Sequence, residues 1–250
     1  MSRRAAVVLC LCLSAAMGSL AAESVTPGEY LTEGAWGSMR VAPASPGRGQ
    51  HFGITSVGGN GHTCELEGDI LNGAAKLDDQ CTLEFAVHPD RISVRSSRTS
   101  GDACRAYCGM RAGFEGDYYP VVPFCRTESA VRAQFLRQYK AAQYRQARDT
   151  LQRLLTRCER FMDWHAQAEV RNDLALTELR LRNKPACLKA LEPLKRDLID
   201  DPARTGRVFA PVDAEWGEAM VKTTRFNWKK CGGVLPPLSR SNTGQDGAAD

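Results

Sequence analysis

The stretch Thr82-Leu83-Glu84-Phe85-Ala86-Val87 decides how the first half of this chain folds. Leu83, Phe85 and Val87 alternate with smaller or polar residues, and this period of two is typical of a strand with one buried and one wet face. Similar short runs lie before and after it, separated by turns rich in Gly, Pro and Asn. The pattern predicts an antiparallel β domain over residues 23–124, folded as a barrel or a sandwich of seven or eight strands.

The remaining strands can be placed from the same alternation and from the turns between them. A short helical turn is expected over residues 102–108, just before the last strand. The other strands are expected at residues 29–31, 38–41, 51–56, 62–67, 74–77, 92–95 and 118–122.

The first residues have the three parts of a bacterial secretory signal. Arg3 and Arg4 give a positive end, residues 5–16 form an apolar run, and small residues end in Ala21-Ala22 before Glu23. The run is shorter than the roughly 20 residues that span a bilayer, which favours a cleaved leader over a membrane anchor. We therefore expect residues 1–22 to be removed and the mature protein to work in the periplasm.

Loss of the leader would leave eight of the 10 cysteines. An even number in an exported chain predicts up to four disulfides. No two of them have the C-x-x-C spacing of a zinc site and the four histidines are scattered, so neither a metal nor a cofactor is expected. The eight are Cys64, Cys81, Cys104, Cys108, Cys125, Cys158, Cys187 and Cys231.

From residue 125 the apolar spacing changes to that of helices, and an all-α domain is expected over residues 125–232. Asp213 is a good N-cap for the last of these helices. Residues 233–250, rich in Gly, Pro and Ser, are expected to form a flexible tail. The helices are expected at residues 130–140, 144–158, 164–182 and 185–198, followed by one that starts at Asp213.

The helical half resembles tetratricopeptide repeats. Two sets of residues share one register at an interval of 40, whereas the family period is 34, and Phe135 stands where the first helix of the repeat usually has Gly. The resemblance implies pairs of antiparallel helices that bury their faces against neighbours. The two sets are Tyr139, Tyr144, Ala147, Leu151 and Leu154, and then Leu179, Lys184, Cys187, Leu191 and Leu194.

The predicted elements suggest how the cysteines pair. A strand that turns back near residue 70 should bring Cys81 beside Cys64, which leaves Cys104 and Cys108 as a local pair. Whether those two pair with each other stays open, because a bridge at this spacing is awkward in a regular helix. In the helical half, antiparallel packing predicts a Cys125–Cys158 bridge, and Cys187 with Cys231 completes the set.

The sequence holds no recognisable catalytic motif, so no catalytic residue is expected. The chain carries 33 Lys and Arg against 29 Asp and Glu, which does not favour nucleic-acid binding. Two features are candidates for binding a partner. Arg171 and Asp173 begin an inner helical face, where the alternative is a buried ion pair. Lys222, Arg225 and Lys229 cluster near the end of the last helix, where the alternative is interaction with the helix dipole.

Further resemblances point to a function class. Residues 55–64 (TSVGGNGHTC) and 103–109 (ACRAYCG) resemble a recurring module of exported proteobacterial proteins. The β pattern is similar to the small barrels of periplasmic lysozyme inhibitors, and the β module joined to helices resembles periplasmic immunity proteins. The resemblance implies an inhibitor or immunity protein whose partner is an exported toxin or a cell-wall hydrolase. An envelope scaffold that binds peptides through its helices is the alternative, and a hydrolase with an unrecognised site is the third possibility.

Overall fold

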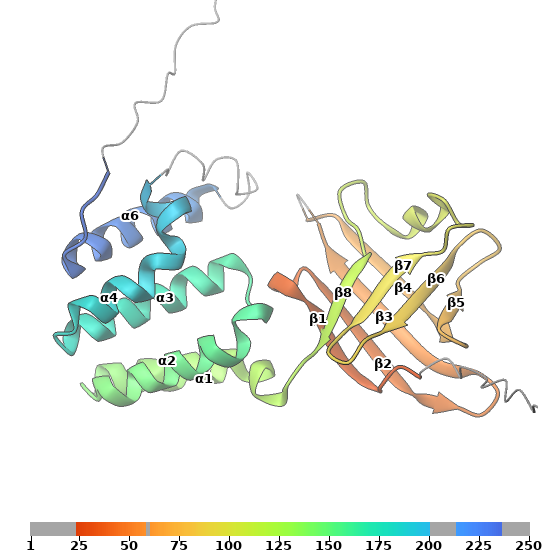
Figure 1. Cartoon of the computed structure of the whole chain (residues 1–250), viewed down its shortest axis with the longest axis horizontal. Helices are drawn as coiled ribbons and strands as arrows, with labels where there is room; N and C mark the ends of the chain where they lie inside the picture. Colours follow the sequence, from red (N-terminus) through yellow and green to blue (C-terminus); the bar gives the residue numbers. More distant parts are fainter. Residues whose placement is uncertain (1–23, 59–60, 201–213, 237–250) are drawn as a thin grey trace, which may run out of the picture.

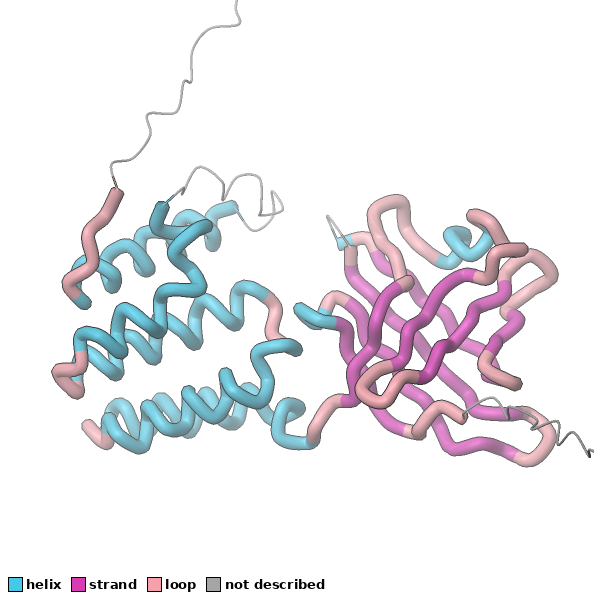
Figure 2. The backbone as a smooth tube through the Cα atoms, viewed as in Figure 1, coloured by secondary structure: helices cyan, strands magenta, loops and turns pink. Residues whose placement is uncertain are grey.

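The computed structural model describes residues 24–58, 61–200 and 214–236. An eight-stranded antiparallel sheet is followed by a helical half that lies beside it (Figures 1 and 2). This order confirms the expected α+β class. The strands are β1 (Gly28–Thr32), β2 (Gly37–Ser45), β3 (Gly49–Val57), β4 (Thr63–Ile70), β5 (Ala74–Lys76), β6 (Thr82–Val87), β7 (Ile92–Ser96) and β8 (Gly116–Pro120).

The sheet curls into a near-barrel around an apolar interior. Its strand order is β4-β3-β2-β1-β8-β7-β6-β5, so four strands separate β3 from β6. Nevertheless Phe52 of β3 and Phe85 of β6 meet edge to face, with ring centroids 4.9 Å apart. Contact between these walls requires the sheet to fold back on itself, and alternate side chains from all the longer strands fill the space between them.

The near-barrel has an open seam between its edge strands, β4 and β5. The two strands meet at their shared turn, where Leu71 and Ala74 form a bridge. Beyond that turn the 3₁₀ segment η3 (Ala103–Tyr107) lies against both edges. Its flank at Cys108 pairs with Cys64 of β4 as an isolated bridge, and the Tyr107 hydroxyl donates to Asp78 beside β5, at 2.7 Å.

Two disulfides fix η3 in this seam, and they correct the pairing expected from the sequence. Cys64 is bonded to Cys108 and Cys81 to Cys104, with Cα–Cα distances of 4.1 and 4.9 Å. The expected Cys64–Cys81 and Cys104–Cys108 pairs are wrong. η3 lies between the two edges. Each edge cysteine is therefore closer to a cysteine at one end of η3 than to the cysteine on the other edge.

The helical half begins with a short 3₁₀ turn, η4 (Pro123–Thr127), and the expected disulfides within it are confirmed. Cys125 pairs with Cys158 and Cys187 with Cys231, at Cα–Cα distances of 5.4 and 5.7 Å. The long helices are α1 (Glu128–Lys140), α2 (Tyr144–Cys158), α3 (Trp164–Arg180), α4 (Lys184–Leu191) and α6 (Ala214–Cys231).

The helix expected at residues 185–198 is not one uniform α-helix. α4 ends at Leu191, and the chain continues as a 3₁₀ turn, η6 (Glu192–Leu194), and a π-helical turn, η7 (Lys195–Asp200). Pro193 accounts for the change, since it has no N–H to donate to the carbonyl four residues earlier. The leader, Asp213 and residues 237–250 of the tail lie outside the described residues. In the described ranges no helix is long and apolar enough to cross a membrane.

A buried polar network joins α3 to α6. The Asn172 side chain is 4% exposed and donates to Thr224 Oγ1 at 2.9 Å, while its Oδ1 accepts from Asn227 at 2.9 Å. Asn172 also donates to the carbonyl of Ala168. All four hydrogen-bonding groups lie away from water, so they depend on one another for partners.

We predict that Asn172→Ala lowers the free energy of unfolding by about 2–3 kcal/mol, because it leaves buried groups of Thr224 and Asn227 unpaired. Chemical denaturation followed by circular dichroism measures this change. The exposed neighbour Thr223 supplies a control, and Thr223→Ala should stay within about 0.5 kcal/mol of the parent protein. Equal stabilities for the two variants would contradict this description of the α3–α6 contact.

Candidate binding face at the end of the barrel

Three exposed apolar residues lie at the end of the barrel where β3 leads into β4: Trp36 and Val57 line one cavity there, and Met110 lies on the loop 109–115 that crosses this end. Trp36, Val57 and Met110 have 38%, 54% and 83% of their surface exposed. The Val57 N–H donates to the Trp36 carbonyl at 2.8 Å, and the carbonyl of Met110 accepts a hydrogen bond from Arg105. We call Trp36, Val57 and Met110, with the cavity beside them, the barrel-end face. Exposed apolar groups of this size that lie together are typical of contact surfaces.

The loop 109–115, which carries Met110, is held to the barrel at successive points. Next to the Cys64–Cys108 disulfide, the Gly109 N–H donates to the Thr63 carbonyl at 2.8 Å. Further along, Ser56 Oγ donates to the Gly113 carbonyl at 2.7 Å. The buried Tyr118 hydroxyl donates to the carbonyl of Phe114 at 2.6 Å, and burial raises the pKa of Tyr118. These contacts keep the loop in one position on the barrel.

Gly58 lies beneath this loop, at a position with no room for a side chain. A Cβ atom at Gly58 would lie 2.0 Å from the carbonyl oxygen of Arg111 and 2.5 Å from the Cα of Ala112. Both neighbours are backbone atoms, so any side chain would displace the loop. A glycine is therefore needed here because two backbone segments approach each other closely.

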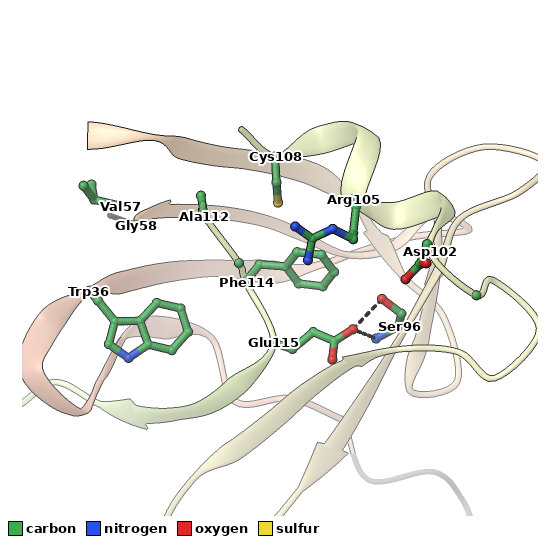
Figure 3. Close-up of a pocket in the computed structure, with 12 residues that line it drawn as sticks. Trp36, Val57, Gly58, Ser96, Asp102, Arg105, Cys108, Ala112, Phe114 and Glu115 are labelled. Atoms are coloured by element: carbon green, nitrogen blue, oxygen red, sulfur yellow. Dashed lines mark hydrogen bonds between the residues drawn. The ribbon is translucent and has the colours of Figure 1, made fainter. Parts of the chain in front are cut away.

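A cavity of about 470 Å³ opens beside these apolar residues. Trp36 lies on one side of it and Asp102 on the other, with Phe114 and Arg105 between them (Figure 3). Glu115 Oε1 accepts from the N–H and the hydroxyl of Ser96, at 3.0 and 2.6 Å. The cavity thus combines an aromatic wall with charges of both signs, which suits a mixed polar and apolar protein surface.

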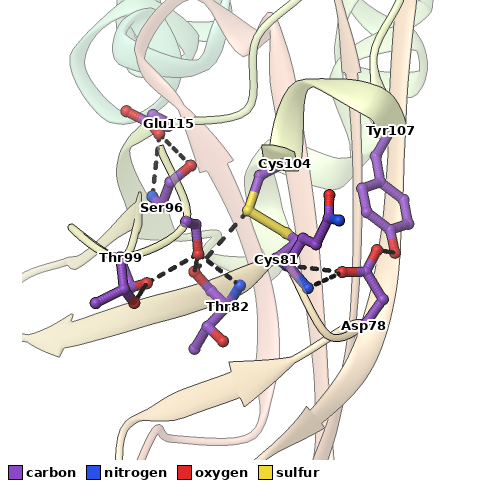
Figure 4. Close-up of a disulfide and its surroundings, with 11 residues drawn as sticks. Asp78, Cys81, Thr82, Ser96, Thr99, Cys104, Tyr107 and Glu115 are labelled. Carbon is purple, nitrogen blue, oxygen red and sulfur yellow. Dashed lines mark hydrogen bonds between the residues drawn. A yellow bond between two sulfur atoms is a disulfide. The ribbon is translucent and has the colours of Figure 1, made fainter. Parts of the chain in front are cut away.

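The second seam disulfide lies behind this cavity, within a network of hydrogen bonds (Figure 4). The Asp78 carboxylate accepts from the hydroxyl of Tyr107 and from the N–H groups of Gln80 and Cys81, each at 2.7 Å. These hydrogen bonds lower the pKa of Asp78, and the one from Tyr107 has the largest effect. η3 is therefore attached to the turn before β6 by a hydrogen bond as well as by Cys81–Cys104.

A His, a Ser and an Asp also lie together elsewhere on the barrel, across β7 and β8. His88 Nε2 is 3.1 Å from Ser93 Oγ, and Ser93 Oγ donates to Asp117 Oδ1 at 2.5 Å. This hydrogen bond lowers the pKa of Asp117, and Arg91 lies 3.2 Å from its other oxygen. The order differs from that of a catalytic triad, in which the serine donates to the histidine. Here the serine proton is directed to the carboxylate.

The structure places the sequence-predicted partner-binding residues Arg171 and Asp173 in internal ion pairs. Arg171 donates to Glu159 and to the carbonyl of Ala190, and its side chain is only 12% exposed. Asp173 lies 3.6 Å from Arg132. Arg171 is mostly buried in its ion pair, whereas Asp173 is 31% exposed and Arg132 28%, so the second pair is half-buried.

The basic cluster on α6 divides into two kinds of residue. Lys222 and Lys229 are exposed, and Phe226 between them is 59% exposed. Arg225 instead donates to the carbonyls of Ile199 and Pro236, which anchors the chain before and after α6. Lys222 and Lys229 remain available to a partner, whereas Arg225 has a structural contact.

Sequence reasoning missed Trp36, Val57 and Met110 as functional candidates. Trp36 and Val57 come together through the pairing of β2 with β3, and the Cys64–Cys108 bridge holds the loop that carries Met110 at the same end of the barrel. No family model matches the chain, and no match was found among curated proteins or among solved structures. Within the described ranges, no group of His, Cys, Asp or Glu could hold a metal ion.

Asp173 gives the helical half a predictable pH dependence. Burial raises its pKa from 3.8 to about 6, Arg132 lowers it and Glu169 raises it. Since the folded-state pKa lies above the unfolded value, the ionised form is penalised above about pH 6, and the penalty disappears as the pH falls toward about 4.

We predict that Asp173→Asn raises Tm by about 2–4 °C at about pH 7.5, because the neutral amide avoids a net penalty of about 1 kcal/mol. The difference from the parent protein should shrink to nothing by about pH 4. Thermal unfolding of both proteins across this range is the measurement. A Tm difference that is constant with pH, or a lower Tm for the variant at about pH 7.5, would contradict the assignment.

Proposed function

We propose that this chain is a periplasmic protein-binding module that neutralises a cell-envelope-degrading hydrolase, as an inhibitor or immunity protein, and that the barrel-end face makes the contact. The observation that carries the proposal is the exposed pair Trp36 and Val57 on the wall of a cavity, next to the disulfide-anchored loop that carries the exposed Met110. Trp and Met are enriched in protein interfaces and are depleted from surfaces that face only water.

Rigidity supports a binding role for this face. The loop 109–115 is fixed by Cys64–Cys108 and by hydrogen bonds to Thr63, Ser56 and Tyr118. A surface already held in its bound conformation loses little entropy when a partner docks, so more of the contact energy appears as affinity. Inhibitors of secreted enzymes gain tight binding in the same way.

The four disulfides support the location. Disulfides persist in oxidising compartments, so the protein belongs to an extracellular or periplasmic environment. Together with the leader expected at residues 1–22, this favours the periplasm, where cell-wall hydrolases and injected effectors act. The resemblances to lysozyme inhibitors, to immunity proteins and to tetratricopeptide-like helices agree with a binding protein.

We predict that the purified protein inhibits at least one muramidase or amidase in a peptidoglycan-clearing assay, and that Trp36→Ala with Met110→Ala weakens this inhibition. Truncating a central interface Trp typically costs about 2 kcal/mol or more, so the inhibition constant should rise by about thirtyfold or more.

The matched control is Leu71→Ala. Leu71 is 55% exposed but lies in the turn after β4, at the opposite end of the barrel, so its truncation should leave inhibition unchanged. If the parent protein inhibits and protects against no envelope hydrolase, the proposal is wrong. Loss of binding on Phe226→Ala alone would favour the envelope-scaffold alternative, since that residue lies on α6.

A further inference from the structure

A row of three arginines runs along the outer side of α2 into the 3₁₀ turn η5 (Glu159–Phe161). Arg153, Arg157 and Arg160 are all exposed. Their spacing of four and then three residues places them on one side of a helix, over an axial length of about 10 Å. We call these three residues the arginine row.

Aromatic rings order the arginine row. The guanidinium carbons of Arg153 and Arg157 lie 5.2 and 5.1 Å from the ring centroid of Phe124. That of Arg160 lies 4.3 Å from the ring centroid of Tyr119. A guanidinium group held over a ring has lost part of its rotational freedom, while its N–H donors remain able to form hydrogen bonds. Tyr119 of β8 and Phe124 of η4, on either side of the junction between sheet and helices, thus hold three cations in place.

The arginine row lacks the carboxylate partners that nearby arginines have. Arg126 pairs with Glu29, Arg132 with Glu169 and Arg148 with Asp149. Among the described residues, none of the three arginines in the row has a salt bridge. A cavity of about 600 Å³ lies beside Arg157 and Arg160, with Glu33 and Glu159 on its lining, but Glu159 is paired with Arg171. Glu33, which also lines the cavity, forms no salt bridge with the row, so within the described residues the three guanidinium groups are not ion-paired.

We propose that the arginine row is a second docking surface, and that its occupant is an acidic segment of a partner protein. Guanidinium groups match carboxylates bidentately, and a row of this length can engage two or three acidic side chains of one segment. A long phosphate polymer would need a more extended basic surface, and the chain as a whole has a net charge of only +4. The surface lies on the helical half, so it does not depend on the barrel-end face.

The test measures binding of a fluorescein-labelled oligoglutamate peptide to the purified chain by fluorescence anisotropy. The variant Arg153→Glu with Arg157→Glu and Arg160→Glu should weaken binding by about tenfold or more, since each charge-assisted contact is typically worth about 1.5 kcal/mol or more. The control, Arg48→Glu with Arg95→Glu and Arg98→Glu, changes the net charge equally at exposed arginines of the barrel and should bind almost as the parent does.

Replacing the three arginines by lysine keeps the charge but removes the bidentate geometry, and it should weaken binding by an intermediate factor. Binding that is partly kept in this variant shows that the glutamate variant lost the surface and not the fold. Circular dichroism checks the fold of each variant in parallel. No binding by the parent protein, or equal losses in the arginine-row and barrel-arginine variants, would overturn the proposal. Stronger competition by inorganic phosphate or by phosphatidylglycerol vesicles than by unlabelled peptide would overturn the assignment to an acidic protein.

Discussion

A curled antiparallel sheet that does not close leaves two strand edges exposed, and here the disulfides Cys64–Cys108 and Cys81–Cys104 fasten η3 between those edges. Unpaired edges invite association with other strands, so covering them protects the fold as well as completing the barrel. The bridges link residues 44 and 23 positions apart. In the chain-entropy model, loops of this length stabilise the native state by about 3–4 kcal/mol each.

The barrel-end face is a consequence of that closure. Cys108 ends η3, and the chain continues directly into the loop 109–115 that carries Met110 and crosses Gly58. Without the Cys64–Cys108 bridge, the loop would be held by hydrogen bonds alone, among them those to Thr63, Ser56, Ser96 and Tyr118, each worth about 1 kcal/mol. The proposed contact surface is thus built on the same element that closes the seam.

Local patterns predicted much of the fold. Alternation such as Leu83-Glu84-Phe85 located all eight strands to within a few residues, and helical spacing located the helices. The Cys125–Cys158 pair also followed, because the ends of adjacent helices in a hairpin are neighbours whatever the details of packing, and Cys187–Cys231 followed as the pair that remained. Pro193 is a local signal for the change from α-helix to 3₁₀ turn after α4. Helical periodicity alone does not predict this change.

The seam and the candidate site depended on information that is not local. Cys64 lies on β4 and Cys81 just before β6, on the two sides of the seam, but η3 lies between them, so Cys81 bonds to Cys104 and Cys64 to Cys108. Trp36, Val57 and Met110 look like ordinary isolated apolar residues until strand pairing places Trp36 beside Val57 and the Cys64–Cys108 bridge fixes the loop of Met110 at the same end. Neither strand periodicity nor composition carries this long-range geometry.

Disulfide mapping of the exported protein tests the closed seam most directly. Trypsin cleavage after Lys76, Arg91 and Arg105 places Cys64, Cys81, Cys104 and Cys108 in four separate peptides, so mass spectrometry without reduction identifies each pair. We predict linked peptides for Cys64–Cys108 and for Cys81–Cys104. Linked peptides for Cys64–Cys81 and Cys104–Cys108 would contradict the seam, and with it the arrangement of the barrel-end face.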